Sequence, residues 1–183
     1  MGRLENLWCY LGCPIEFAAE DCSSENVFFD KKKLVDFLSQ KKVKVLDPKK
    51  ISFNGVSEFK NRMDLFKEKN FKEIRRQMKI IVRKDLRCVD KSDFSITYLP
   101  KGVRTTGSIH EIVNADNQKK PTLIICPEGI EHVPGWLFGI IPLEYMFDSV
   151  DDLILYLNSV DREPHDDRWQ FVLENIKDIE TGF

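Results

Sequence analysis

The apolar positions of this chain fall into short runs that charged, amphipathic stretches separate. A short apolar run bounded by turn residues is typical of a strand that is buried on both faces of a sheet. Gly12 and Pro14 end the first run, and Asp47 with Pro48 ends the second. The pattern predicts strands over residues 7–11, 43–46, 94–99, 122–126 and 141–147.

The stretches between these runs carry apolar residues at intervals of three or four, which is the period of an amphipathic helix. Ser149 precedes two aspartates and marks a helix start, because its hydroxyl can accept a free backbone N–H and acidic residues suit the positive end of a helix. The pattern predicts helices over residues 28–40 and 108–117, a third that begins at Ser149, and two within residues 57–84 that break near Asn70.

Strands and helices therefore alternate, as in an α/β domain with a largely parallel sheet. A length of 183 residues corresponds to one domain of ordinary size. Residues 144–183 hold eleven acidic residues against three basic ones. We expect a main domain over residues 1–160 and an acidic, helical C-terminal extension over residues 161–183.

The composition is that of a folded globular protein, with 42% hydrophobic and 32% charged residues. The net charge of −2 gives no overall attraction to polyanions, so we expect neither a nucleic acid nor a membrane as partner. No apolar run approaches the roughly 20 residues that cross a bilayer, and the first residues lack the pattern of a signal peptide. We expect a cytoplasmic protein.

The cysteine and histidine residues do not indicate a metal site. The five cysteines contain no CxxC pair, and the three histidines are far apart. We expect no disulfide framework, no metal ion and no cofactor.

Polar residues gather in three segments that we place at the carboxyl ends of the strands, where open parallel sheets bind their ligands. These segments are residues 10–16, 84–87 and 104–111. In the last of them, helical spacing puts Ile109 and Ile112 on one face and Glu111 on the other. A place in the first helical turn favours the ionised form of that carboxylate, as a nucleophile requires.

These residues also have structural interpretations. From spacing alone, Glu111 is more often a surface residue that only stabilises a helix start. Asp85 alone suits a cap, and Tyr10 suits a core aromatic residue with a hydrogen-bonded hydroxyl. Spacing by itself leaves both interpretations open.

The three segments taken together resemble a known family. WCYLGCPIEF, RKDLRCVDKSDFSITYL and TTGSIHEIVNADNQKKPTLIIC occur in this order and resemble the nucleoside 2-deoxyribosyltransferases and the related 2′-deoxynucleoside 5′-monophosphate N-glycosidases. The resemblance covers roughly residues 7–157. It implies a flavodoxin-like three-layer fold, in which helices flank a five-stranded parallel sheet.

The resemblance also implies roles for individual residues. The nucleophile of the family falls on Glu111, the tyrosine that orients it on Tyr10, and the acid that protonates the leaving base on Asp85. Attack of Glu111 on the anomeric carbon of a deoxyribose follows the logic of a retaining glycosidase. The resemblance places the base pocket at Gly12, Cys13, Pro14 and Ile15.

Two positions depart from the nucleoside transferases. Thr105 stands where those enzymes carry an aspartate for the sugar 5′-hydroxyl, and His132 stands where they carry an asparagine that a neighbouring subunit usually supplies. An aspartate would repel a phosphate at this position. A phosphate is instead bound well by hydroxyl groups, a guanidinium and the free N–H groups at a helix start. The candidate anion site consists of Arg104, Thr105, Thr106, Gly107 and Ser108, with His132 as a further donor.

Three functions remain open at this point. The chain is expected to be a deoxyribosyltransferase that moves bases between nucleosides, an N-glycosidase that hydrolyses a 2′-deoxynucleoside 5′-monophosphate, or a non-catalytic nucleotide-binding module of the same fold. The presence of Tyr10, Asp85 and Glu111 together argues against the last. The resemblance further implies a homo-oligomer that shares the loop from Glu128 to Trp136 between subunits.

Overall fold

The computed structural model describes residues 2–13, 25–48, 62–102, 105–163 and 166–180. Five strands form one sheet in the order β2-β1-β3-β4-β5, and every neighbouring pair is parallel. This is the strand order of flavodoxin-like folds. The predicted α/β class and five-stranded parallel sheet are confirmed. The strands are β1 (Trp8–Gly12), β2 (Lys44–Leu46), β3 (Phe94–Tyr98), β4 (Thr122–Ile125) and β5 (Met146–Phe147).

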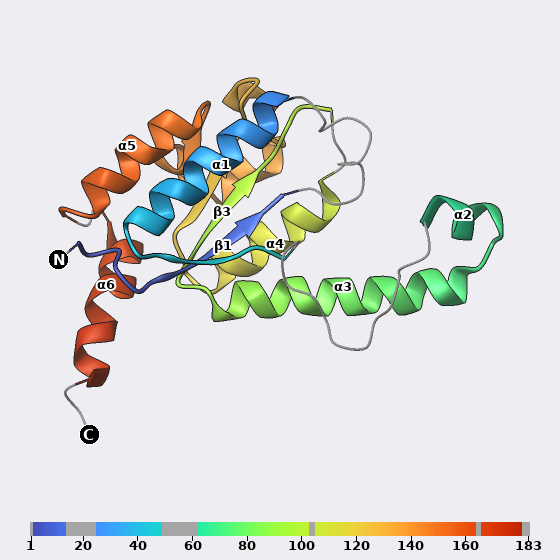
Figure 1. Cartoon of the computed structure of the whole chain (residues 1–183), viewed down its shortest axis with the longest axis horizontal. Coiled ribbons are helices and arrows are strands. Elements are labelled where there is room, and N and C mark those ends of the chain that lie inside the picture. Colours follow the sequence, from blue (N-terminus) through green and yellow to red (C-terminus); the bar gives the residue numbers. More distant parts are fainter. Residues whose placement is uncertain (1, 14–24, 49–61, 103–104, 164–165, 181–183) are drawn as a thin grey trace.

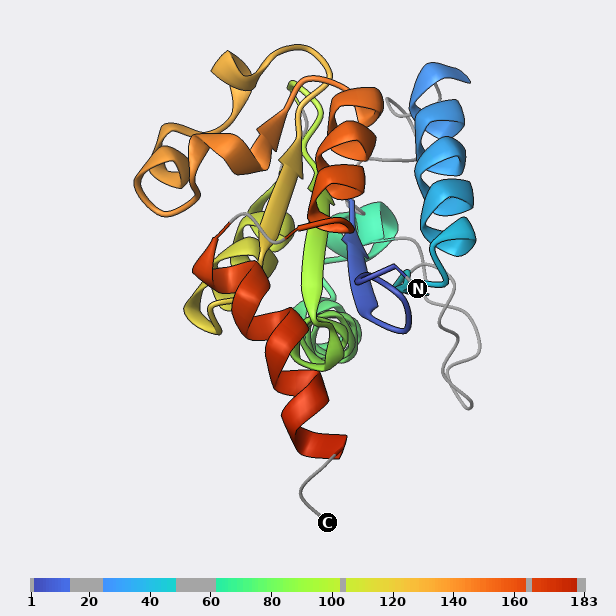
Figure 2. The same ribbon diagram turned by 90° about the vertical axis from the view of Figure 1, so that its left-hand side faces the viewer.

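Helices cover both faces of the sheet, which makes three layers (Figures 1 and 2). One face carries α1 (Glu25–Gln40) and α5 (Val150–Val160), and the other carries α3 (Phe71–Lys91) and α4 (Thr106–Asn117). Figure 1 shows that α2 and the outer half of α3 project away from the sheet. The remaining elements are α2 (Arg62–Lys67), α6 (Asp167–Glu180) and the 3₁₀ helices η1 (Ile130–His132), η2 (Gly135–Gly139) and η3 (Leu143–Tyr145).

Two helix boundaries follow from capping. Asn70 separates α2 from α3, and its side chain accepts the N–H of Glu73 at 3.2 Å. Ser149 accepts the N–H of Asp152 at 3.1 Å at the start of α5. Both predicted boundaries are confirmed, because short polar side chains satisfy backbone donors that no helical carbonyl reaches.

Two predicted elements are wrong in extent. The helix predicted to end at Lys84 continues to Lys91, so residues 84–87 lie inside α3 and not at a strand end. Its buried stripe continues through Asp85, Cys88 and Val89, which the charged composition of the segment concealed. The centre of the strand predicted over residues 141–147 is the 3₁₀ helix η3, and only the last two residues pair with β4.

The C-terminal segment contributes to the core. Trp169 in α6 is fully buried, and its ring centroid lies 5.2 Å from that of Phe94 in β3. Its indole N–H donates to the Tyr156 hydroxyl at 2.9 Å. The division into residues 1–160 and 161–183 stays a prediction. Among the described helices, no apolar stretch is long enough to cross a bilayer.

Candidate active site

The strand order reverses between β1 and β3, because β2 lies beyond β1 while β4 and β5 lie beyond β3. Gly12, the last residue of β1, pairs in register with Thr97 of β3. Open parallel sheets bind ligands in the crevice outside such a reversal. Tyr10 lies two residues before Gly12 in β1, so both residues face the same side of the sheet. On that side, Tyr10 packs with Cys88 of α3 and Ala115 of α4.

Tyr10 and Glu111 form the centre of the candidate site. The buried Tyr10 hydroxyl donates a hydrogen bond to the Glu111 carboxylate, which comes from α4. Burial, and next the negative charge of Glu111, raise the pKa of Tyr10 far above its ordinary value. The phenol therefore stays protonated and acts as a fixed donor that orients the carboxylate.

Asp85 approaches from the neighbouring helix α3, and its residue is only 3% exposed. Among the described residues, its Oδ1 has no hydrogen-bond partner. The nearest cation is Lys84, whose Nζ lies 3.9 Å from that oxygen and donates at 2.7 Å to the carbonyl of Pro48. A buried carboxylate oxygen that lacks a partner is uncommon and is suited to accept a ligand.

Hydrogen bonds between α3 and α4 hold the two carboxylates in one layer. The Asp90 carboxylate of α3 accepts from Asn114 of α4 at 3.3 Å and from Gln118 at 2.8 Å. Lys120, one residue before the Pro121 that precedes β4, donates to the carbonyls of Val89 and Asp90 at 2.7 and 2.8 Å. A lysine there binds carbonyls of the last turn of α3, where a cation also suits the negative end of the helix.

The electrostatics of Glu111 differ from the sequence-based expectation. Because α4 begins at Thr106, Glu111 lies in its second turn, where the helix dipole has little effect. Burial raises the pKa of Glu111 to about 7, the Tyr10 hydrogen bond works in the opposite direction, and the charge of Asp85 raises it further. The expected stabilisation of the ionised form by the helix start is therefore wrong.

Asp85 is perturbed in the same direction. Burial raises the pKa of Asp85 to about 6, and Lys84 works against this rise. Groups that titrate near neutral pH are suited to proton transfer. The two carboxylates interact, so protons leave the pair in steps that belong to both groups.

Close packing around Gly12 explains why the site needs glycine there. A Cβ atom at this position would lie 3.1 Å from Tyr10 Cε1, 3.2 Å from Thr97 Oγ1 and 3.4 Å from Glu111 Oε2. Thr97 was missed by the sequence analysis, although Ser95 and Thr97 are polar at alternate positions of an otherwise apolar strand. Cys88 was also missed, and it lies close enough for Asp85 and Glu111 to influence its pKa.

Solved structures share this architecture. A 2-deoxyribosyltransferase from the psychrotolerant bacterium Bacillus psychrosaccharolyticus is 17% identical, with a TM-score of 0.56 over 80% of this chain and 90% of that chain. A conserved protein from Enterococcus faecalis V583 is 17% identical, with a TM-score of 0.57 over 84% and 98%. A 2-deoxyribosyltransferase from Leishmania mexicana is 16% identical, with a TM-score of 0.50 over 84% and 97%. This chain has the deoxyribosyltransferase fold.

The likeness lies in the structure. No family model matches the sequence. Comparison with curated proteins also finds no match. The resemblance that the three sequence motifs carry is thus confirmed at the level of the fold.

Within this deoxyribosyltransferase fold, the described residues of the candidate anion site lie at the start of α4. Thr105 is the N-cap residue, and its side chain makes no capping hydrogen bond. Thr106 and Gly107 are exposed, whereas Ser108 is buried. The Arg104 position lies outside the described residues.

Of the other predicted binding residues, the structure describes Cys13 and His132, which follow different strands. Cys13 directly follows β1 and is half-buried, whereas Pro14 and Ile15 lie outside the described residues. His132 lies in η1 after β4, with its Nε2 4.0 Å from Glu131. Among the described residues, no hydrogen bond or ion pair joins it to Tyr10, Asp85 or Glu111. Over the same described ranges, no group of three or more His, Cys, Asp or Glu side chains is placed to hold a metal ion.

Proposed function

We propose that this protein cleaves the N-glycosidic bond of 2′-deoxynucleosides or their 5′-monophosphates, as a nucleoside 2-deoxyribosyltransferase. The observation that carries the proposal is the hydrogen bond from the buried Tyr10 hydroxyl to Glu111, with Asp85 in the same layer. This group lies beside the strand-order reversal, where the fold class binds ligands. The fold that the chain shares with two 2-deoxyribosyltransferases supports the proposal.

In the proposed first step, a Glu111 oxygen forms a bond to the anomeric carbon as the bond between that carbon and the base breaks. The electron pair of the broken bond goes to the base, and Asp85 supplies a proton to it. The product is a deoxyribosyl ester of Glu111. A second base then attacks the same carbon from the face that the first base left, and its ring N–H gives a proton to the Asp85 carboxylate. The bond from the carbon to Glu111 breaks, which restores the free Glu111 carboxylate and retains the configuration.

The protonation states set the pH dependence. Glu111 must be ionised to attack, which its hydrogen bond with Tyr10 favours, and Asp85 must be protonated to donate. Because the pKa values are about 7 and about 6, we expect kcat/KM to follow a bell-shaped curve with limbs near those values. A flat profile between pH 5 and 8 would remove the acid–nucleophile pair from the chemistry.

The covalent step is tested by trapping it. An active wild-type protein treated with a 2-fluoro-arabinosyl nucleoside should gain the mass of one sugar on Glu111, because the fluorine destabilises the oxocarbenium-like transition states of both steps. Glu111→Ala and Glu111→Gln should lose cleavage and labelling and keep the wild-type circular dichroism spectrum. The exposed Glu68→Gln serves as control and should keep both. Labelling that persists in Glu111→Gln contradicts the proposal.

A panel of substrates separates the remaining functions. Deoxynucleosides and their 5′-monophosphates are incubated with and without an acceptor base, and the products are separated by chromatography. A new nucleoside indicates transfer, and free deoxyribose or its 5-phosphate indicates hydrolysis. No turnover of any substrate would favour the non-catalytic nucleotide-binding module.

One observation favours the second candidate, a 2′-deoxynucleoside 5′-monophosphate N-glycosidase. Thr105 makes no capping hydrogen bond, so the first N–H groups of α4 are not bonded by the N-cap side chain. Such a helix start suits a phosphate. If this site binds the 5′-phosphate, the monophosphate should be cleaved faster than the nucleoside, and Arg104→Ala should reduce that advantage.

We expect the active form to be a homo-oligomer. Three large apolar side chains are exposed in the segment between β4 and β5: Trp136 at 78%, Leu143 at 60% and Phe138 at 43%. Apolar groups gathered on one surface segment are typical of a subunit contact. An active monomer by light scattering at micromolar concentration would reject a site shared between subunits.

A further inference from the structure

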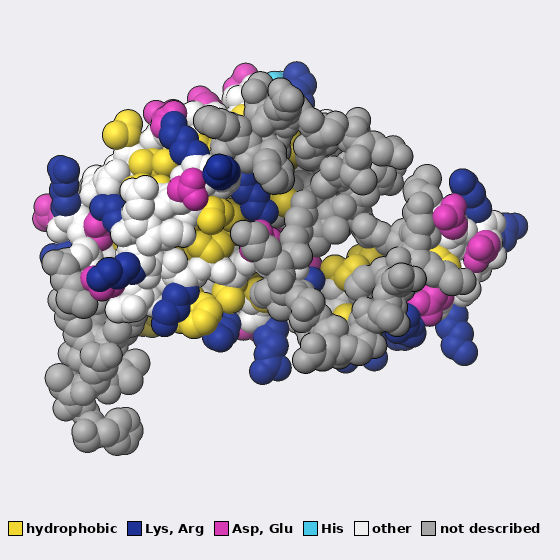
Figure 3. Space-filling view, in the orientation of Figure 1, with side chains coloured by type: hydrophobic (Ala, Val, Ile, Leu, Met, Phe, Trp, Pro, Cys, Tyr) yellow, Lys and Arg dark blue, Asp and Glu magenta, His cyan; other side chains and the backbone are white. Residues whose placement is uncertain are grey.

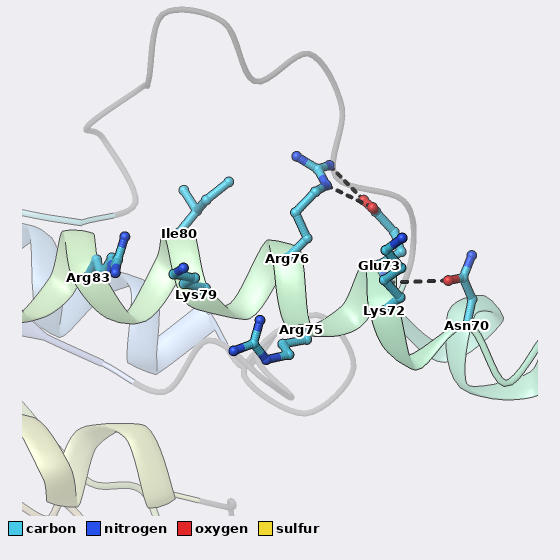
Figure 4. A pocket seen from close by; sticks show the side chains of 8 residues that line it. All are labelled: Asn70, Lys72, Glu73, Arg75, Arg76, Lys79, Ile80 and Arg83. Carbon is cyan, nitrogen blue, oxygen red and sulfur yellow. Dashed lines mark hydrogen bonds and ion pairs between the residues drawn. The ribbon is translucent and has the colours of Figure 1, made fainter.

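A basic groove lies along the outer half of α3, on the part of the molecule that projects from the sheet (Figures 1 and 4). Its volume is about 720 Å³, and its described lining consists of five cations, the acidic Glu73, the polar Asn70 and the apolar Ile80. The cations are Lys72, Arg75, Arg76, Lys79 and Arg83. Figure 3 shows further Lys and Arg side chains along this lower edge of the molecule.

Within the described part of the chain, most of the cations in the basic groove have no acidic partner. Arg76 binds Glu73 with two hydrogen bonds, of 2.7 and 2.6 Å (Figure 4). Among the described residues, Lys72, Arg75, Lys79 and Arg83 form no ion pair. Glu73 is the one acidic residue among the described residues that line the groove, so this described lining carries a net positive charge.

The stability of α3 does not explain this arrangement. At 100° per residue, the five cations fall within about 100° of one another on a single face. Like charges three and four positions apart repel one another and destabilise a helix. The opposite face carries Gln77, Asp85 and Val89, which are buried, so the basic groove is also separate from the catalytic layer.

Two exposed aromatic residues flank Asn70 in the sequence, at the end of α3 where the groove begins. Phe71 begins α3 directly before Lys72 and is 60% exposed, and Phe66 of α2 is 54% exposed. Both rings lie within five residues of Asn70, which lines the groove. Unpaired cations beside exposed aromatic rings are the combination with which proteins bind single-stranded nucleic acid, since the cations contact phosphates and the rings stack on bases.

We propose that the basic groove of α3 binds single-stranded nucleic acid. From Lys72 to Arg83 the groove follows about 16 Å of helix, which spans several nucleotides rather than one phosphate. The guanidinium forks of Arg75 and Arg83 suit phosphate oxygens. A flat anionic membrane fits less well, because it would also approach the exposed acidic residues Asp64 and Glu68 of the same projection.

The overall charge does not oppose this binding. The net charge of −2 averages the basic groove with an acidic C-terminal segment, and Figure 1 shows α6 at the other end of the molecule. Attraction at the groove depends on charges within about 10 Å, because salt screens those beyond. The expectation that no nucleic acid is a partner followed from the whole-chain sum. The proposed binding does not depend on the proposed catalysis.

Fluorescence anisotropy of a labelled 20-nucleotide single-stranded DNA of mixed sequence, with the full-length protein, tests the proposal. The triple variant Arg75→Gln, Lys79→Gln, Arg83→Gln should bind about 100-fold more weakly at 50 mM salt, and the slope of log K against log salt should become shallower by about 2. Phe71→Leu should weaken binding about tenfold through lost stacking. A duplex of equal length should bind less well.

A matched control removes the same charge elsewhere on the surface. The variant Lys32→Gln, Lys101→Gln, Arg162→Gln changes three exposed cations outside the groove and should keep the wild-type affinity and salt slope. Equal losses in the two triple variants would overturn the proposal, as would no binding of DNA at 50 mM salt. Unchanged binding by Phe71→Leu, or equal affinity for duplex, would overturn the single-strand assignment.

Three further measurements distinguish this proposal from other occupants of the groove and from the catalytic proposal. Sedimentation with phosphatidylserine vesicles and light scattering of the protein alone should show no dependence on the groove cations. A loss of vesicle binding or of self-association in the groove variant, with DNA binding intact, would assign the groove to a membrane or a second copy. Nucleoside cleavage by the groove variant should equal that of wild type.

Discussion

Asp85→Asn should make the protein more stable at neutral and alkaline pH while it impairs the proposed reaction. The Asp85 carboxyl is almost fully buried, and its Oδ1 has no hydrogen-bond partner among the described residues. Burial raises its pKa from 3.8 to about 6. Since one pKa unit corresponds to about 1.4 kcal/mol, the ionised side chain destabilises the folded state by about 3 kcal/mol.

The sign follows from proton binding. Between pH 3.8 and about 6 the folded protein holds the Asp85 proton more tightly than the unfolded chain, so stability falls as pH rises through this window. The destabilisation is about 1.6 kcal/mol at pH 5 and about 3 kcal/mol at pH 8. Asparagine carries no such charge, so the advantage of the variant should grow by about 1.4 kcal/mol between these two pH values.

Urea unfolding followed by circular dichroism at pH 5 and pH 8 measures this difference in free energy. In thermal unfolding, the difference in Tm between variant and wild type should widen by about 3–6 °C between the two pH values for a chain of this size. The exposed Asp64→Asn is the control, with an expected change within about 0.5 kcal/mol at both pH values. A stability difference between Asp85→Asn and wild type that does not change with pH would refute the idea that burial raises the pKa of this carboxylate. Cleavage should meanwhile slow by roughly 100- to 10,000-fold, and less for bases that leave easily.

Two other substitutions test the packing. Gly12→Ala places a methyl group 3.1 Å from Tyr10 Cε1 and 3.4 Å from Glu111 Oε2, so we expect a loss of about 1–3 kcal/mol in stability and at least a tenfold loss of activity. Wild-type kinetics with a normal Tm would show that the site tolerates the atom. Trp169→Ala should lower the free energy of unfolding by about 3–5 kcal/mol in urea, since the ring is fully buried against Phe94. A change below about 1 kcal/mol would mean that α6 is not part of the core.

The sequence alone determined the order and kind of most elements. Apolar runs such as residues 94–99 and 122–126 are short and bounded, so their local pattern identifies buried strands. Caps at Asn70 and Ser149 are likewise local, because a side chain there bonds a backbone group three residues away. The motif resemblance located Tyr10 and Glu111, which the structure joins by a hydrogen bond.

Contacts between distant segments required the tertiary structure. The place of Asp85 inside α3, the role of Thr97 beside Gly12 and the burial of Trp169 all depend on residues far away in the chain. The high pKa of Glu111 has the same origin, because desolvation comes from the packing of β1, α3 and α4, and outweighs the local effects of a helix start. The basic groove also required the tertiary structure. Its cations gather on one face of α3, whereas in the net charge of the whole sequence the acidic residues cancel them.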